Sequence, residues 1–200
     1  MSALTDLYEV IANCEGCVLS EARARAVPGE GPEDAQIVFI GEAPGFHEDQ
    51  QGRPFVGSAG QFLNELLESI GLRREDVYIC NVIKCRPPGN RDPVPEEMEA
   101  CKPFLDRQIE IISPQMIVTL GRVAMERYFP GAKISYVHGR PRKVAGIIYY
   151  PMYHPAAALH QPKWREVIRE DMLRIPQLLA EADSIAEAEL PQSAEQLSLF

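Results

Sequence analysis

The stretch Ile37-Val38-Phe39-Ile40-Gly41-Glu42-Ala43-Pro44-Gly45 leads from an apolar run directly into a polar turn framed by glycine and proline. Four bulky apolar residues bounded by turn residues are typical of a strand buried on both faces. A second such junction lies far downstream, where residues 147–150 (Ile-Ile-Tyr-Tyr) precede Tyr153-His154-Pro155-Ala156-Ala157. In open α/β sheets, ligands bind beyond the carboxyl ends of the strands. The two junctions therefore predict one site that receives a carboxylate from Glu42 and an imidazole from His154.

The rest of the chain alternates between strand-like runs and segments with a helical spacing of apolar residues. The strand-like runs lie at residues 37–40, 77–83, 116–120 and 144–150. Helical spacing is found at residues 4–11, 62–70, 122–129 and 163–179, and another helix begins near Pro95. Strands that alternate with helices form a parallel sheet covered on both faces. We therefore expect an α/β fold, a three-layer sandwich with a central, mostly parallel, four-stranded sheet flanked by helices.

Length and composition indicate one folded domain followed by a short tail. The 200 residues are 46% hydrophobic and 24% charged, which is typical of a single α/β domain, expected here over residues 1–179. Residues 180–195 are rich in alanine and glutamate without a sustained apolar face, so residues 180–200 are expected to form a flexible acidic tail. No apolar run approaches the ~20 residues that cross a bilayer. The N-terminus lacks the basic start and apolar stretch of a signal peptide, so a cytoplasmic location is expected.

The net charge of −9 is unevenly distributed. Residues 1–83 carry five basic and fourteen acidic side chains, whereas residues 84–143 carry eleven basic and seven acidic ones. Because screening confines a local field to roughly 8–10 Å at physiological salt, a basic face can still meet phosphates in an acidic protein. Charge alone does not distinguish such a face from an ordinary solvated surface.

Four of the five cysteines have the character of metal ligands. Cys14-Glu15-Gly16-Cys17 places two thiolates within reach of one centre, a spacing shared by zinc sites and redox dithiols. Cys85 and Cys101 would have to be brought to that centre by the fold, whereas a structural zinc site more often adds a second closely spaced pair. Cys80 lies inside a strand-like run and is expected to be a buried thiol.

Together these features resemble the iron–sulfur (family 4) uracil-DNA glycosylases, from about Cys14 to about residue 179. The resemblance implies the fold of that superfamily and one 4Fe-4S cluster, with the ligands Cys14, Cys17, Cys85 and Cys101. Zinc is the alternative metal. The cluster would tie the N-terminal helix and the 84–101 loop to the sheet. It would also hold the basic side chains of that loop in place for DNA, namely Lys84, Arg86 and Arg91.

Cutting uracil from deoxyribose requires a flipped base, a stabilised leaving anion and a water that reaches the sugar. By the resemblance, Phe55 stacks on the flipped base, and His154 faces uracil O2 as a neutral donor that stabilises the developing anion. Asn81 can donate and accept at once, which suits N3–H and O4 of uracil and rejects cytosine. Glu42 is the candidate for positioning the water, activating it, or stabilising positive charge on the sugar, and the sequence leaves these roles open.

The resemblance implies further contacts around the base. The backbone amides of Gly41, Glu42 and Ala43 would lie against uracil, since glycine allows a close approach. Glu48 matches a position that would crowd a 5-methyl group and exclude thymine. Leu159 is the expected wedge that enters the minor groove and fills the vacated stack. Ala43 stands where another small residue, often glycine, occurs, and the loop lacks the basic insertion of relatives that bond covalently to the abasic sugar, so turnover is expected.

The last five residues, Gln196-Leu197-Ser198-Leu199-Phe200, resemble the pentapeptide that binds the bacterial sliding clamp. A flexible tether would deliver this motif to an apolar groove and raise its effective concentration there. A fraying helix end is the alternative. The motif favours a bacterial, nucleoid-associated enzyme in the cytoplasm, and we expect a monomer.

The sequence therefore predicts a uracil-DNA glycosylase that flips uracil out of DNA and hydrolyses its N-glycosidic bond, leaving an abasic site for base excision repair. One alternative is a non-catalytic iron–sulfur protein that recognises uracil or abasic DNA. Another is a zinc-stabilised nucleotide hydrolase on a similar sheet. In a glycosylase, the catalytic residues would be Glu42, Asn81 and His154. Their joint presence counts against the non-catalytic binding protein.

Overall fold

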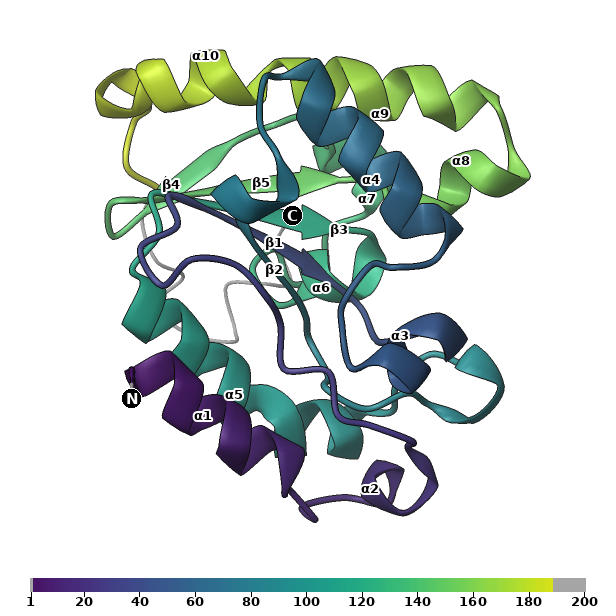
Figure 1. The fold of residues 1–200 in the computed structure, drawn as a ribbon. Helices are drawn as coiled ribbons and strands as arrows, with labels where there is room; N and C mark the ends of the chain where they lie inside the picture. The colour runs from purple at the N-terminus through teal and green to yellow at the C-terminus, as the bar shows by residue number, and fades with distance from the viewer. Residues whose placement is uncertain (1, 189–200) are drawn as a thin grey trace.

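The computed structural model describes residues 2–188, and its centre is one five-stranded sheet (Figure 1). The strand order is β2-β1-β3-β5-β4. The strands are β1 (Ile37–Gly41), β2 (Tyr78–Asn81), β3 (Met116–Leu120), β4 (Arg142–Val144) and β5 (Ile147–Met152). β2, β1, β3 and β5 run parallel, so their carboxyl ends share one edge of the sheet. Only β4, of the strands in the described chain, is antiparallel to its neighbour.

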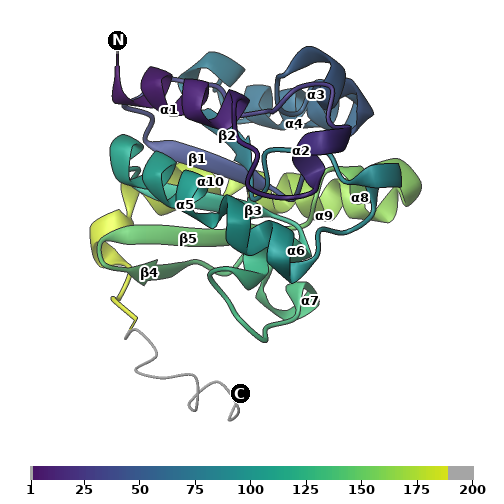
Figure 2. The ribbon, with the colours of Figure 1, turned by 90° about the horizontal axis from the view of Figure 1, so that it is seen from below.

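Helices cover both faces of the sheet, which confirms the three-layer α/β fold (Figures 1 and 2). One core packs α4 (Ser58–Ser69), α9 (Lys163–Leu173) and α10 (Ile175–Ala180) against the face that carries Phe39. The other packs α1 (Ala3–Ala12), α5 (Pro95–Ile112) and α6 (Arg122–Glu126) against the face that carries Val38. The alternation of side chains along a strand sends these neighbours to opposite cores. The short helices are α2 (Leu19–Ala22), α3 (Phe46–Gln51), α7 (Ile134–Val137) and α8 (Ala156–His160).

The expectation of four strands is wrong by one. The run 144–150 is not a single strand, because a turn at Ala145 and Gly146 divides it into the hairpin β4–β5. Both turn residues have positive φ, at 49° and 80°, as two-residue hairpins of the favoured type require. Alanine is an unusual residue at such a position, and the apolar pattern therefore gave no sign of the turn.

The predicted helices are present, and prolines affect two of them, α5 and the C-terminal helix, which was expected to kink near Pro176. α5 continues through Pro103, whose ring lies on the exposed face, where water can bond the carbonyl that loses its partner. The C-terminal helix is broken at Arg174, and Pro176 begins the next helix in the first turn, where its missing N–H costs nothing.

The packed chain extends past residue 179, the boundary that composition suggested. A 3-10 turn at Ala182–Ser184 follows α10, and Ala182 is buried in the core. Beyond it, Glu187 forms a bridge with Lys143 of β4, and the Ala188 N–H donates to the Lys143 carbonyl at 2.8 Å. The clamp-like pentapeptide lies outside the described residues. Among residues 2–188 no helix has the length and apolarity that crossing a membrane requires.

Candidate active site

A cavity of about 560 Å³ lies at the carboxyl edge of the parallel strands. Four side chains from distant parts of the sequence line it together: Glu42 after β1, Phe55 from the 52–57 loop, Asn81 at the end of β2, and His154 after β5. The other residues expected around the base also line it, namely Ala43, Glu48 and Leu159. The structure therefore brings the expected side chains to one hollow. Glu42, Asn81 and His154 meet there because their strands end at the same edge, and the 52–57 loop adds Phe55.

Gly41, the last residue of β1, lies directly behind the wall of this cavity. A Cβ atom built on it would overlap the Asn81 Oδ1 atom and would stand only 2.6 Å from the Phe55 ring. Both approaches are far closer than van der Waals contact, so any larger residue would displace the amide or the ring. The close approach that the sequence assigned to glycine here therefore serves the two side chains that would face the base.

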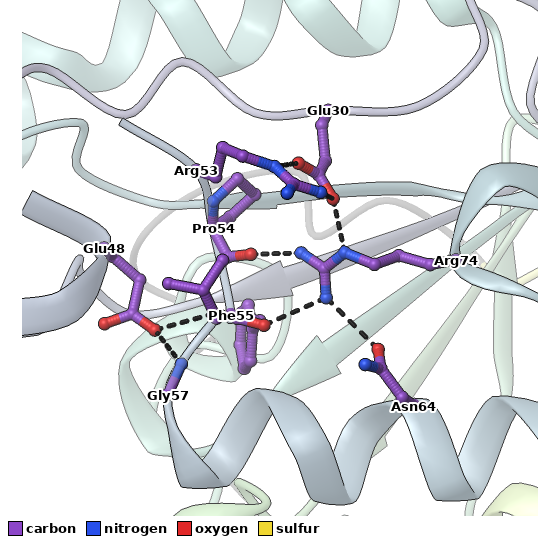
Figure 3. A network of polar contacts seen from close by, with 9 residues as sticks. Glu30, Glu48, Arg53, Pro54, Phe55, Gly57, Asn64 and Arg74 are labelled. Atoms are coloured by element: carbon purple, nitrogen blue, oxygen red, sulfur yellow. Dashed lines mark hydrogen bonds and ion pairs between the residues drawn. The ribbon is translucent and has the colours of Figure 1, made fainter. Parts of the chain in front are cut away.

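Phe55 is held in a left-handed conformation by contacts from several elements (Figure 3). Its φ is 52°, which is uncommon for a bulky residue and requires support from its surroundings. The Arg74 guanidinium donates to the Phe55 carbonyl at 2.9 Å and to the Pro54 carbonyl, and Glu30 in turn accepts from Arg74. On the other side of Phe55, the backbone approaches Gly60 so closely that a Cβ atom there would overlap the Phe55 carbonyl.

Glu48 supports the same loop from the opposite side. Its Oε1 atom accepts hydrogen bonds from the Val56 N–H at 2.8 Å and the Gly57 N–H at 2.9 Å (Figure 3). Carboxylates that accept two backbone N–H groups hold them firmly, because the bonds are charge-assisted. Glu48 therefore lines the cavity and also fixes the loop that carries Phe55, a task that the sequence did not indicate.

The structure defines the protonation of His154. Its ring lines the cavity, and desolvation by the surrounding protein lowers its pKa to about 4, against a weak opposing effect of the Glu48 charge. The imidazole is therefore neutral near pH 7. The Ala156 N–H donates to Nδ1 at 3.1 Å, so Nδ1 is the acceptor and the single ring proton lies on Nε2. Gly121 packs against the His154 Cβ atom, since a Cβ at this glycine would lie 3.0 Å from it.

The electrostatics around Glu42 differ from those around an ordinary surface carboxylate. Desolvation is the main cause that raises its pKa above the usual value for a glutamate, and the negative charge of Asp92 raises it further. The positive charge of Arg122 acts in the opposite direction, and Arg122 is itself paired with Asp92. Glu42 therefore takes up a proton more readily than usual while it stays partly open to the cavity.

Asn81 is almost fully buried, at 2% exposure, and its backbone is anchored by a buried lysine. The Lys84 ammonium donates to the Asn81 carbonyl and to the Gln108 Oε1 atom, both at 2.7 Å. Lys84 is 1% exposed, so the expectation that it would face DNA is wrong. Its long side chain turns inward because these two acceptors compensate the buried charge. Arg86 and Arg91 of the same loop remain open to solvent.

The four candidate cysteine ligands line a second, smaller hollow between α1, the loop after β2, and α5. Three of the four Sγ atoms accept hydrogen bonds there: Cys14 from the Gly16 N–H, Cys85 from Arg23, and Cys101 from the Lys84 N–H, at 3.2–3.4 Å. No three His, Cys, Asp or Glu side chains of residues 2–188 are grouped tightly enough to ligate one metal ion. The fifth cysteine, Cys80, is confirmed as a buried strand residue with no exposed surface.

Sequence reasoning missed the residues that support the cavity and one that forms its rim. Arg74 and Glu30 gave no signal, because a charged residue is usually solvated. Phe46 also lines the cavity, and its 52% exposure could not be read from its neighbours in the sequence.

Comparisons with known proteins show which family this chain resembles. The family model of the uracil DNA glycosylase superfamily matches residues 28–174. A type-4 uracil-DNA glycosylase from Archaeoglobus fulgidus is 48% identical over 187 residues, which cover 89% of this chain and 94% of the relative. Those from Sulfurisphaera tokodaii and Thermotoga maritima are 47% and 48% identical, over 89% and 82% of this chain and 86% and 88% of the relatives.

Proposed function

The chain belongs to the type-4 branch of the uracil-DNA glycosylase superfamily, and from this we propose that it flips uracil out of DNA and hydrolyses its N-glycosidic bond. The product is an abasic site, the entry point of base excision repair. The observation that carries the proposal is the meeting of Glu42, Phe55, Asn81 and His154 at one cavity. Its volume of about 560 Å³ admits a flipped pyrimidine together with its sugar.

His154 stabilises the departing base. A neutral imidazole whose proton lies on Nε2 is a hydrogen-bond donor in advance of the reaction, and it needs no proton from solvent. As the glycosidic bond breaks, the electron pair passes to uracil and negative charge develops on O2. A preorganised donor at that oxygen lowers the barrier by ~3–4 kcal/mol.

Glu42 acts on the sugar side of the same bond. In its ionised form it orients the attacking water and faces the positive charge that develops on the anomeric carbon. The raised pKa makes it a better proton acceptor than a solvated glutamate, so it can take the proton that the water loses. Desolvation is the main cause of this raised pKa, and the charges of Asp92 and Arg122 adjust it in opposite directions.

Recognition of uracil combines stacking with hydrogen bonds. Phe55 provides the face on which the base stacks, and Asn81 offers one donor and one acceptor to its Watson–Crick edge. Glu48 lies beside the 5-position and excludes the methyl group of thymine. The backbone amides of Glu42 and Ala43, with Gly41 directly behind them, contact the base, and Leu159 fills the vacated stack in the duplex.

The cysteines Cys14, Cys17, Cys85 and Cys101 hold one 4Fe-4S cluster. They share one hollow, and three of them, Cys14, Cys85 and Cys101, accept N–H···S hydrogen bonds there, as cluster thiolates do. The donor set is four thiolates with only one closely spaced pair, which suits a cluster better than a structural zinc site, since the latter more often adds a second close pair. When bound, it supplies a structural link between α1, the loop after β2, and α5.

Two further parts of the proposal concern partners. The C-terminal pentapeptide, Gln196 to Phe200, binds the sliding clamp of a bacterial host, and the enzyme works as a monomer on the nucleoid in the cytoplasm. Deletion of these five residues is expected to abolish retention on the immobilised clamp while activity on short oligonucleotides is unchanged. Retention that survives the deletion contradicts the assignment.

The central test is base release. The protein is incubated with a uracil-containing oligonucleotide, and abasic sites are then cleaved with alkali. Strand scission is expected at uracil and not at thymine in the same position. A mobility shift without scission, by protein whose iron and sulfide content shows an intact cluster, would instead favour a non-catalytic uracil-binding protein.

A further inference from the structure

Two exposed apolar side chains lie on the rim of the cavity. Phe46, the first residue of α3, is 52% exposed, and Leu159 of α8 is 46% exposed. Figure 1 shows α3 and α8 at the same end of the sheet, α8 above the strand ends and α3 below them. The other large exposed apolar residues of the described chain line no part of this cavity: Val10, Val18, Val94, Tyr136 and Leu173. Leu159 has a proposed role as the wedge, whereas Phe46 has none.

The Phe46 ring is fixed in orientation although it is exposed. The Arg86 guanidinium lies over the ring, with its carbon 5.2 Å from the ring centroid. Arg86 is itself held, because its Nε–H donates to the Asn90 Oδ1 atom at 2.7 Å. The His47 ring meets Phe46 edge-on, at 5.5 Å and 79°. A cation over an aromatic face contributes roughly 0.5–1 kcal/mol at an exposed site, enough to favour one orientation.

This arrangement has no explanation in the fold. Phe46 belongs to neither of the two apolar cores, so it does not stabilise the domain by burial. Its open surface faces the solvent beside the cavity into which uracil would turn. A rigid aromatic ring with a basic side chain behind it is the usual means by which proteins bind unpaired nucleotides, because every base offers a π face and every nucleotide a phosphate.

We propose that Phe46, backed by Arg86, is a stacking platform for the nucleotide that directly adjoins the flipped uracil on the same strand. The proposal rests on the proposed function and adds a second base-binding position to it. When uracil leaves the stack, its neighbour loses one stacking partner. Phe46 replaces that partner, and Arg86 lies where it can meet the adjoining phosphate. The platform reads no sequence, since stacking accepts all four bases.

A protein–DNA double-mutant cycle tests the platform. Wild type and Phe46→Ala are compared on single-stranded uracil oligonucleotides, either intact or with an abasic spacer in place of the nucleotide 5′ or 3′ to uracil. On the intact strand, Phe46→Ala is expected to raise KM about 5- to 150-fold and leave kcat within about twofold, since a stacked base contributes ~1–3 kcal/mol. A spacer on one side of uracil is expected to raise the KM of wild type by the same factor as the Phe46→Ala substitution does. The same spacer is expected to leave the KM of Phe46→Ala unchanged.

The controls separate stacking from other effects. Phe46→Tyr keeps an aromatic face and is expected to retain the wild-type KM. Leu173→Ala removes a side chain of similar exposure (56%) that lies on α9 and lines no part of the cavity, so its KM should not change. Because Phe46 is exposed, the alanine variant is expected to keep the wild-type melting temperature.

Three results would overturn the platform. The first is an unchanged KM in Phe46→Ala, and the second is a spacer that raises the KM of Phe46→Ala as much as that of wild type, on either side of uracil. The third, measured after the same strands are annealed to a complement, is an effect of Phe46→Ala on the duplex alone. The last would make Phe46 a second wedge. Failure of the proposed function is recognised separately, because wild type would then release no uracil. In that case the same four combinations of protein and DNA are compared by Kd, measured by fluorescence anisotropy. If the effects of the substitution and of the spacer on Kd are then independent, the platform is contradicted.

Discussion

The Arg74 guanidinium donates a 2.9 Å hydrogen bond to the Phe55 carbonyl and thereby holds the ring of Phe55 at the cavity. The two residues come from different elements, and the link between them passes through the backbone of Phe55 and not through its ring. Arg74 also bonds the Asn64 Oδ1 atom of α4 at 3.3 Å. The loop that presents the stacking surface is thus tied at once to the sheet edge and to a core helix.

Replacement of Arg74 by methionine is expected to weaken both the fold and the binding of substrate. It removes one of the two guanidinium groups that donate to the Glu30 carboxylate, of which only Arg53 would remain, and it leaves the Pro54 and Phe55 carbonyls without their side-chain donor. The free energy of unfolding in urea should therefore fall by ~2–4 kcal/mol. The freed Phe55 should leave its strained conformation, and KM should rise about 5- to 20-fold at a temperature where the variant is folded. Arg73→Met is the matched control, because Arg73 is 69% exposed and paired only at the surface, with Glu75 and Asp76. Equal effects of both substitutions would contradict the role of Arg74.

The acid side of the pH–rate profile is expected to follow Glu42. Its raised pKa means that the reactive carboxylate is protonated, and the rate falls, at a higher pH than for an ordinary glutamate. Asp92→Asn removes a negative charge and should shift this limb to lower pH, whereas Arg122→Gln removes a positive charge and should shift it to higher pH. Single-turnover rates measured over the acid range decide the matter. Shifts of the same sign in both variants would show that another group titrates.

His154 is expected to affect the rate and, separately, the dependence of stability on pH. His154→Ala removes the donor at uracil O2 and should lower kcat by roughly 10²- to 10³-fold. Because the folded pKa is about 4 and the ordinary value is 6.5, the unfolded chain binds a proton that the folded protein refuses. The free energy of unfolding should therefore be unaffected by His154 above pH 6.5 and should decline between pH 6.5 and about 4. The free energy of unfolding is measured by urea titration at each pH for wild type and His154→Ala. Plotted against pH, it should fall more steeply for wild type over this range. Parallel plots would contradict the lowered pKa of His154.

Cys101 and Cys80, which are both buried, are expected to behave differently. Cys101→Ser removes a cluster ligand, so the purified protein should lose iron, sulfide and visible absorption, and its melting temperature should fall. Cys80→Ser changes a thiol of equal burial that lies away from the hollow and should keep all three. Metal analysis that finds one zinc per chain in wild type would replace the cluster by the alternative metal.

Much of the architecture could be predicted from the sequence, because it is encoded locally. Apolar runs followed by Gly/Pro turns marked β1 and β5. The rule that ligands bind where parallel strands end then predicted from these residues alone that Glu42 and His154 share one site. The same local signals failed at Ala145, where a residue with low preference for positive φ makes the turn that creates a fifth strand.

The supporting contacts were inaccessible to sequence reasoning, because they join residues that nothing in the chain relates. Arg74 is 19 positions from Phe55 and 44 from Glu30, and only the packing of the loop against the sheet brings their polar groups together. In the same way, Lys84 appeared basic and exposed by type, yet the fold surrounds it with two acceptors and buries it. Strands, turns and the residue types at their ends follow from short-range pattern. The charge state of Glu42 and His154, the conformation of Phe55 and the open face of Phe46 depend on burial and on neighbours far away in sequence, which exist only once the chain has folded.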